Sequence, residues 1–150
     1  MNISDAIKIT NQIAKGKQFS IVYSKTITPK KKSDLYGKKI KKISKLNVRL
    51  VTYGNQAAVK EKRDNGMEKC PNNWTKLSDG IFQDHNGIFK MCLAPTKLKN
   101  QVNSSKYLLE NKEIEYAELE NHLLSKDKKK TNLDIDWFTL SIDNILEIKA

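Results

Sequence analysis

The sequence predicts a single α+β domain over residues 1–150, with a curved or barrel-like antiparallel sheet of about six short strands and three short helices. Two observations predict this class. Short stretches that alternate apolar and polar side chains are separated by turn residues, whereas helical periodicity occurs in only three places. A chain of 150 residues also has the length of one domain with its own core.

Local patterns place the elements of the first half in order. Helices are assigned where apolar residues recur every three or four positions beside capping residues, and strands where they alternate. Pro and Gly mark several ends. We expect a first helix capped by Ser4 or Asp5 and ended by Gly16, followed by a strand at 18–27 that Pro29 closes. A lysine-rich loop is expected at 28–39 and a helix at 56–64. Between them we expect a β stretch that begins at Ile40, has a break in its alternation near Ser44, and has its better part at 47–53.

The second half contains two predicted hairpins. Asn86-Gly87 favours the positive φ angles of a type I′ turn, and the strand that returns from it is expected at 87–93. A second hairpin-like turn is expected at Asn111-Lys112. The remaining expected elements are a helix at about 116–124, a charged loop at 126–132, and one or two strands over 137–148, at 138–142 and 145–148.

The position of the positive charge is the strongest signal for function. The net charge is +11, yet residues 1–100 carry 21 basic and 7 acidic side chains, while residues 101–150 carry 7 and 10. Nine lysines and one acid, Asp34, lie between Lys25 and Lys45. Such a segment repels itself unless solvent or an acidic partner neutralises it, so we expect it to face outward.

The basic residues are almost all lysines, with only two arginines in the chain. Lysine neutralises phosphate as a mobile point charge, whereas the arginine fork reads base edges. Lysines interleaved with tyrosines therefore indicate sequence-tolerant binding of DNA or RNA, with counterion release at the phosphates and stacking on unpaired bases. The predicted binding residues are Lys30, Lys31, Lys32, Tyr36, Lys38, Lys39, Lys41, Lys42, Lys45 and Arg49.

Other interpretations of the same lysines stay open. They could contact an acidic or nucleic-acid-binding host protein, or they could form a solvated loop beside an edge strand that lysine protects from aggregation. The chain is rich in Lys, Asn and Ile together, which an AT-rich genome also produces.

No motif in the sequence predicts a reaction, so we expect a binding protein and not an enzyme. Two histidines and two cysteines are the only soft ligands, and no two of them have metal-site spacing, so neither a metal nor another cofactor is expected. Cys92 lies in an alternating pattern that predicts a packed core thiol. No stretch has the length of a membrane span, and a soluble protein of a reducing cytoplasm is expected.

Three segments of the chain together resemble small, mostly uncharacterised proteins encoded by bacteriophages. They are residues 47–63, residues 106–114 with the glutamate-rich segment that follows, and residues 138–148, about half of the chain. The resemblance implies a phage or mobile-element origin and action in the bacterial host cytoplasm. Phage proteins of this size bind DNA, block a host defence enzyme or form part of the virion. Two further functions therefore stay open: an inhibitor of a host defence protein, anti-CRISPR-like or other, that acts by protein–protein contact, and a virion structural component.

Overall fold

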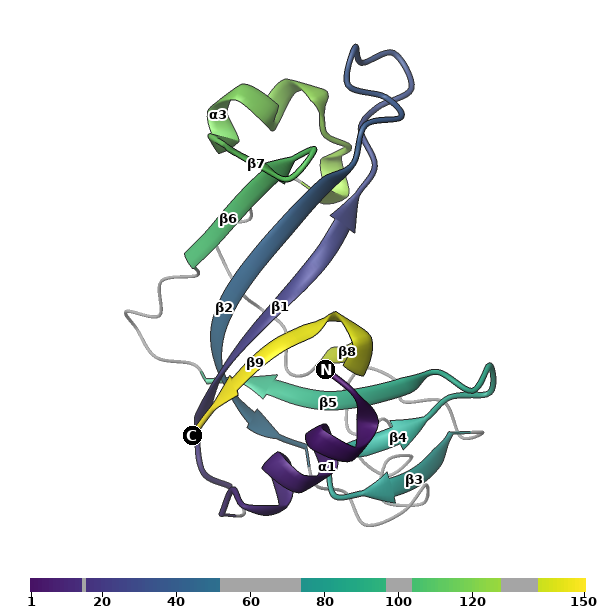
Figure 1. The fold of residues 1–150 in the computed structure, drawn as a ribbon, viewed down its shortest axis with the longest axis vertical. Helices are drawn as coiled ribbons and strands as arrows, with labels where there is room; N and C mark the ends of the chain where they lie inside the picture. The colour runs from purple at the N-terminus through teal and green to yellow at the C-terminus, as the bar shows by residue number, and fades with distance from the viewer. Residues whose placement is uncertain (15, 52–73, 97–103, 128–137) are drawn as a thin grey trace.

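A long antiparallel hairpin organises the fold. β1 (Phe19–Ile27) pairs with β2 (Ile40–Leu50) from Phe19 opposite Val48 to Ile27 opposite Ile40. Figure 1 shows this hairpin rising from a body of further strands towards a loop at the far end of the molecule. The computed structural model describes residues 1–14, 16–51, 74–96, 104–127 and 138–150.

The hairpin belongs to a nine-stranded sheet with the path β3-β4-β5-β2-β1-β9, in which β6 pairs with β2 and β7, and β8 pairs with β5. All of these pairings are antiparallel. The sheet curls into a half-barrel, which confirms the predicted α+β class. The other strands are β3 (Thr75–Ser78), β4 (Ile81–Gln83), β5 (Phe89–Pro95), β6 (Ser104–Leu109), β7 (Lys112–Ile114), β8 (Phe138–Ser141) and β9 (Ile145–Lys149).

The described residues contain two α-helices instead of the predicted three, and nine strands instead of about six. The two helices are α1 (Ile3–Asn11) and α3 (Tyr116–Leu119). The predicted helix at 56–64 lies outside the described residues. Three 3-10 turns follow within the described ranges: η1 (Glu120–His122), η2 (Ser125–Asp127) and η3 (Ile142–Asn144).

Both described helices differ from their predicted limits. The cap of α1 is Asn2, whose side chain accepts the backbone N–H of Asp5 at 2.8 Å, so the predicted cap at Ser4 or Asp5 is wrong. α3 ends after four residues and continues as η1. The predicted helix could not reach residue 124 because Leu123 is buried in an extended conformation and forms a β-bridge with Pro29.

The predicted break in β2 is wrong, because the strand runs without interruption from Ile40 to Leu50. Ile40, Ser44 and Leu46 are buried on one side, whereas Lys41, Ile43 and Lys45 point to the other. Ser44 keeps the phase because its small hydroxyl is buried beside Ser105, with the two oxygens 3.4 Å apart. The apolar side chain of Ile43 therefore lies on the side opposite the core, and side chains alternate between the two sides along the whole strand.

The type I′ turn occurs in the other hairpin. Glu110 and Asn111, between β6 and β7, have φ angles of 49° and 68°. In the β4–β5 turn only Gly87 has a positive φ, so the type I′ turn predicted there is wrong. Asp84 shapes that turn instead, since its carboxylate accepts the backbone N–H groups of Asn86 and Ile88.

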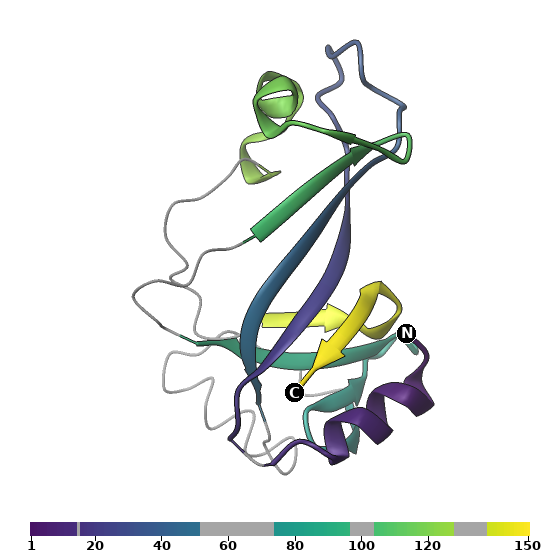
Figure 2. The ribbon, with the colours of Figure 1, turned by 60° about the vertical axis from the view of Figure 1, so that its left-hand side comes forward.

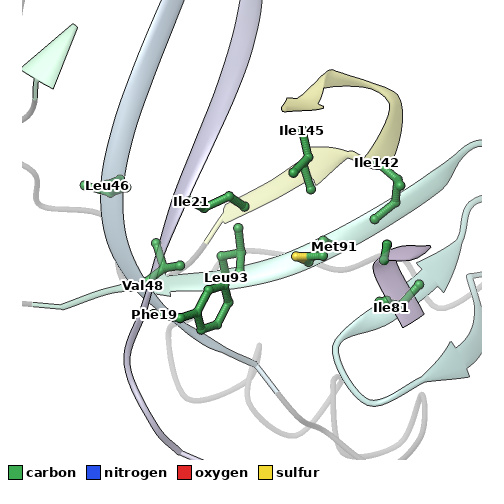
Figure 3. Packing of buried hydrophobic residues seen from close by; sticks show 10 residues of the cluster. Phe19, Ile21, Leu46, Val48, Ile81, Met91, Leu93, Ile142 and Ile145 are labelled. Carbon is green, nitrogen blue, oxygen red and sulfur yellow. The ribbon is translucent and has the colours of Figure 1, made fainter. Parts of the chain in front are cut away.

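Two clusters of buried residues lie on the same side of the β1–β2 hairpin, which we call the inner face. The body core packs α1 against the sheet and includes Phe19, Ile21 and Met91 (Figure 3). The distal core lies at the loop end of the hairpin and contains Ile27, Ile40, Tyr107, Leu119 and Leu123.

A third cluster lies across the sheet from the body core. It contains Val51, Trp74, Phe82 and Cys92. The side chain of Cys92 is buried, as predicted.

Candidate functional site

The tip loop, residues 28–39, joins β1 to β2 at the end of the molecule that lies farthest from α1 (Figures 1 and 2). The ten residues predicted to bind a polyanion separate into three groups in the structure. Six lie in the tip loop, three lie on the side of β2 opposite the inner face, which we call the outer face, and one lies on the inner face. These groups are Lys30, Lys31, Lys32, Tyr36, Lys38 and Lys39, then Lys41, Lys45 and Arg49, and finally Lys42.

The first half of the tip loop is fixed to η1. The backbone N–H of Lys30 donates to the carbonyl oxygen of His122 at 2.8 Å. Ser33 Oγ lies 2.7 Å from His122 Nδ1, and the Pro29–Leu123 bridge adjoins this contact. The loop is therefore held by a segment far along the chain and not only by its own turns.

The second half of the tip loop is fixed to the β6–β7 turn. The backbone N–H of Lys39 donates to Glu110 Oε1 at 2.8 Å, and the backbone N–H of Glu110 donates to the Lys39 carbonyl oxygen at 2.9 Å. Between the two anchors, Leu35 packs against the distal core. Because the loop is attached at both ends and in the middle, its lysines are presented from a defined backbone.

The charge of the tip loop is not neutralised internally. The loop contains five lysines and one acid, Asp34. Within the described part of the chain, none of these five ammonium groups lies within 4.0 Å of a carboxylate oxygen. All but Lys30, which is half-buried, are exposed. Like charges this close repel one another, so an anion that binds here relieves an unfavourable interaction.

The outer face of β2 carries a row of cations. Lys41, Lys45 and Arg49 are exposed at every fourth position, which places neighbours about 13 Å apart along the strand. Lys106 on β6 lies directly opposite Ile43, and Lys149 on β9 lies opposite Ser20, so both join the same face.

Sequence reasoning missed Lys106 and Lys149 as members of this surface. Only the pairing of β6 with β2 and of β9 with β1 places them there. Lys106 forms a 3.5 Å ion pair with Glu113, and Lys149 forms a 3.6 Å pair with Glu147, in both cases with more than half of each side chain exposed. Exposed pairs of this kind contribute little free energy and leave both lysines able to change partners.

Lys42 is separated from the other predicted residues. It is half-buried on the inner face, with Nζ 5.9 Å from the centre of the Tyr107 ring. Lys25 lies opposite it on β1 and forms a 3.3 Å ion pair with Asp127, whose side chain is only 3% exposed. These two lysines therefore take part in contacts that hold the distal part of the molecule together.

The tyrosines near the lysines also divide. Tyr36 is 52% exposed in the tip loop, beside the lysines with which it was predicted to act. Tyr23 is on the inner face with its ring centre 6.4 Å from that of Phe138, and burial raises the pKa of its phenol. Tyr53 lies outside the described residues.

Comparison of the chain with protein-family models, with curated proteins and with solved structures finds no match. No group of three or more His, Cys, Asp or Glu side chains in the described ranges is placed to hold a metal ion. None of the helices in those ranges has both the length and the apolar character that crossing a membrane requires.

Proposed function

We propose that this protein binds nucleic acid through the phosphate backbone, with little dependence on base sequence, and that the tip loop is the main contact. One observation carries the proposal. Five lysines without a carboxylate partner among the described residues are held on a loop that is anchored to η1 and to the β6–β7 turn. Lysines that are held in place before a partner binds lose less conformational entropy on binding, which supports a role in binding.

The chemistry of the side chains favours backbone contact over base reading. Each lysine that neutralises a phosphate releases condensed counterions, so affinity falls steeply as salt is added. The tip loop contains no arginine, the residue whose planar fork pairs with guanine edges. Tyr36 is exposed enough to stack on an unpaired base or to lie against a sugar.

A charge-reversal experiment with a matched control tests the proposal. Lys31→Glu/Lys32→Glu changes two exposed side chains of the tip loop, and Lys8→Glu/Lys17→Glu makes the same change in net charge on exposed side chains near α1, at the other end of the molecule. Binding of a labelled duplex of about 20 base pairs is measured between about 50 and 200 mM salt.

We expect the affinity of the tip-loop variant to fall at least about tenfold, because two phosphate contacts disappear. For the same reason the salt slope, which is the slope of log K against log salt concentration, should become shallower by about two. The control variant should lose much less. Equal losses in the two variants would show that only net charge matters. Unchanged binding of the tip-loop variant would remove the proposal and favour the alternative, contact with an acidic patch on a host protein.

A further inference from the structure

The outer face of the hairpin is lined by exposed and half-buried side chains. In the described part of the chain, none of its side chains is buried, whereas the inner face contributes buried residues to both the body core and the distal core. Three half-buried apolar residues, Val22, Ile43 and Leu108, lie among the polar and charged ones. The cations of this face are Lys41, Lys45, Arg49, Lys106 and Lys149.

The dimensions of this face match a segment of double helix. From Lys41 to Arg49 the row extends about 26 Å at ~3.3 Å per residue. This equals the rise of about eight base pairs, and the tip loop continues the row beyond Lys41. Paired strands twist with a fixed hand, so the row of cations winds gradually, as a phosphate backbone does around a duplex.

The side chains of the outer face do not suit a single strand. Proteins that hold single strands stack bases on aromatic rings. The described outer-face positions carry no aromatic residue, and the rings of Tyr23 and Tyr107 point to the inner face. Tyr36 in the tip loop is the one aromatic residue among the large apolar side chains that are well exposed in the described ranges.

The same side chains do not suit a protein partner either. Protein–protein interfaces are enriched in Tyr, Trp and Arg at their centre and depleted in Lys. The outer face has four lysines and one arginine around the aliphatic residues Val22, Ile43 and Leu108. Two of the lysines, Lys106 and Lys149, lie beside the carboxylates of Glu113 and Glu147. The outer face offers many mobile point charges and no large anchor, which favours an extended, regularly charged partner.

We infer that the outer face of β6, β2, β1 and β9 continues the tip loop as one contact surface for the phosphate backbone of a double-stranded nucleic acid, with Lys45 and Lys106 near its centre. This inference rests on the proposed function and adds the structural class of the ligand and a second set of contacts. It also includes Lys106, for which the sequence alone gave no signal.

The test uses variants that remove charge without adding acid. Lys45→Gln/Lys106→Gln is compared with Lys8→Gln/Lys17→Gln, and Lys45→Arg/Lys106→Arg restores the charge at the first pair of positions. The probes are a duplex of about 20 base pairs and its single strand of the same sequence. Far-ultraviolet circular dichroism and thermal unfolding of every variant show that the fold is retained.

We expect the wild-type protein to bind the duplex more tightly than the single strand at equal salt. The Lys45→Gln/Lys106→Gln variant should lose about two phosphate contacts, which lowers the salt slope by about 1.8, and the arginine pair should restore it. The Lys8→Gln/Lys17→Gln variant should keep the wild-type slope.

The outcomes separate this inference from the proposed function. If charge reversal in the tip loop weakens binding but the outer-face variant binds like the wild type, the proposed function stands and the inference is wrong. Tighter binding of the single strand than of the duplex has the same meaning. If poly-L-glutamate competes as well as the duplex at equal charge concentration, the face is a general surface for acidic chains, and the inference is again overturned. Failure of both sets of variants to weaken binding removes both proposals.

Discussion

Ser33 and His122 connect the tip loop to η1 across 89 positions of sequence, with Ser33 Oγ 2.7 Å from His122 Nδ1. The same hydroxyl oxygen accepts the backbone N–H of Leu35 at 3.0 Å. One side chain thus fixes both the turn of the loop and its attachment to the distal part of the molecule. A loop ordered before binding loses less conformational entropy when it binds, which favours affinity.

Loss of this anchor should weaken binding without removing a phosphate contact. We expect Ser33→Ala and His122→Ala each to raise the Kd for the duplex about threefold to tenfold, because a hydrogen bond of this kind contributes about 0.5–1.5 kcal/mol. The number of lysines is unchanged, so the salt slope should equal that of the wild type. The measurement is a salt titration of binding at one fixed pH for the three proteins. A change in slope would show that the anchor itself contacts the ligand.

The distal core should support the tip loop independently of charge. Leu119 is fully buried there, whereas Leu124, five residues later, is 37% exposed. We expect Leu119→Ala to lower the free energy of unfolding by about 2–5 kcal/mol, and Leu124→Ala by much less. Denaturant unfolding gives both values. If Leu119→Ala lowers the free energy of unfolding as little as Leu124→Ala does, the packing of α3 against the hairpin contributes little to stability.

The hydroxyl of Tyr107 is buried and has no hydrogen-bond partner among the described residues. We therefore expect Tyr107→Phe to raise the free energy of unfolding at neutral pH by about 1 kcal/mol, because it removes a polar group that folding desolvates. The ring remains available to Lys42 and to Tyr116, whose ring centre lies 5.3 Å away. Tyr36→Phe in the exposed loop serves as the control and should change stability little. A clear loss of stability in Tyr107→Phe would show that the hydroxyl has a partner after all.

The same phenol predicts a pH dependence. Burial, with smaller contributions from Tyr116 and Asp127, raises the pKa of Tyr107 above its usual value of 10.0. When the pKa of an acid is higher in the folded than in the unfolded state, the free energy of unfolding is highest below the unfolded-state pKa, here about 10. It falls as the pH rises through the folded-state pKa. Unfolding of the wild type should therefore become easier above about pH 10, and less so in Tyr107→Phe. Parallel pH curves for the two proteins would contradict this assignment.

The ion pair between Lys25 and Asp127 should be asymmetric. The Asp127 side chain is 3% exposed and the Lys25 side chain 58%. Lys25→Met leaves a buried carboxylate without its cation, and we expect a loss of about 1–2 kcal/mol, less than for a fully buried pair because solvent still reaches the site. Lys25→Arg should retain most of the stability. In Lys25→Met/Asp127→Asn the loss should be smaller than the sum of the single losses, and strict additivity would exclude coupling.

Local patterns in the sequence were sufficient for several elements. β1, the β6–β7 turn and the pair of C-terminal strands lie close to their predicted positions, because alternation and turn residues act over a few positions. The interruption predicted in β2 shows the limit of such patterns. Ile43 is apolar and Ser44 is polar, which suggested the break, yet Ser44 takes the core position beside Ser105. That choice depends on a strand about sixty residues away.

The candidate surface was also predictable only in part. The run of lysines identified the tip loop, because charge density is a local property of the sequence. It did not separate Lys42 from Lys41, whose side chains point to opposite sides of one strand, and it could not include Lys106. Both facts follow from strand register, which pairs segments distant in the chain and has no local signature in this sequence.

The slope of log K against log salt for wild-type protein and the 20-base-pair duplex tests the central claim most directly. If the tip loop and outer face contact phosphates together, at least about five ions should be released, which corresponds to a slope of about −4.5 or steeper. A slope near zero, or no binding at about 50 mM salt, would contradict the account, because lysines held for a polyanion must release counterions when they meet one.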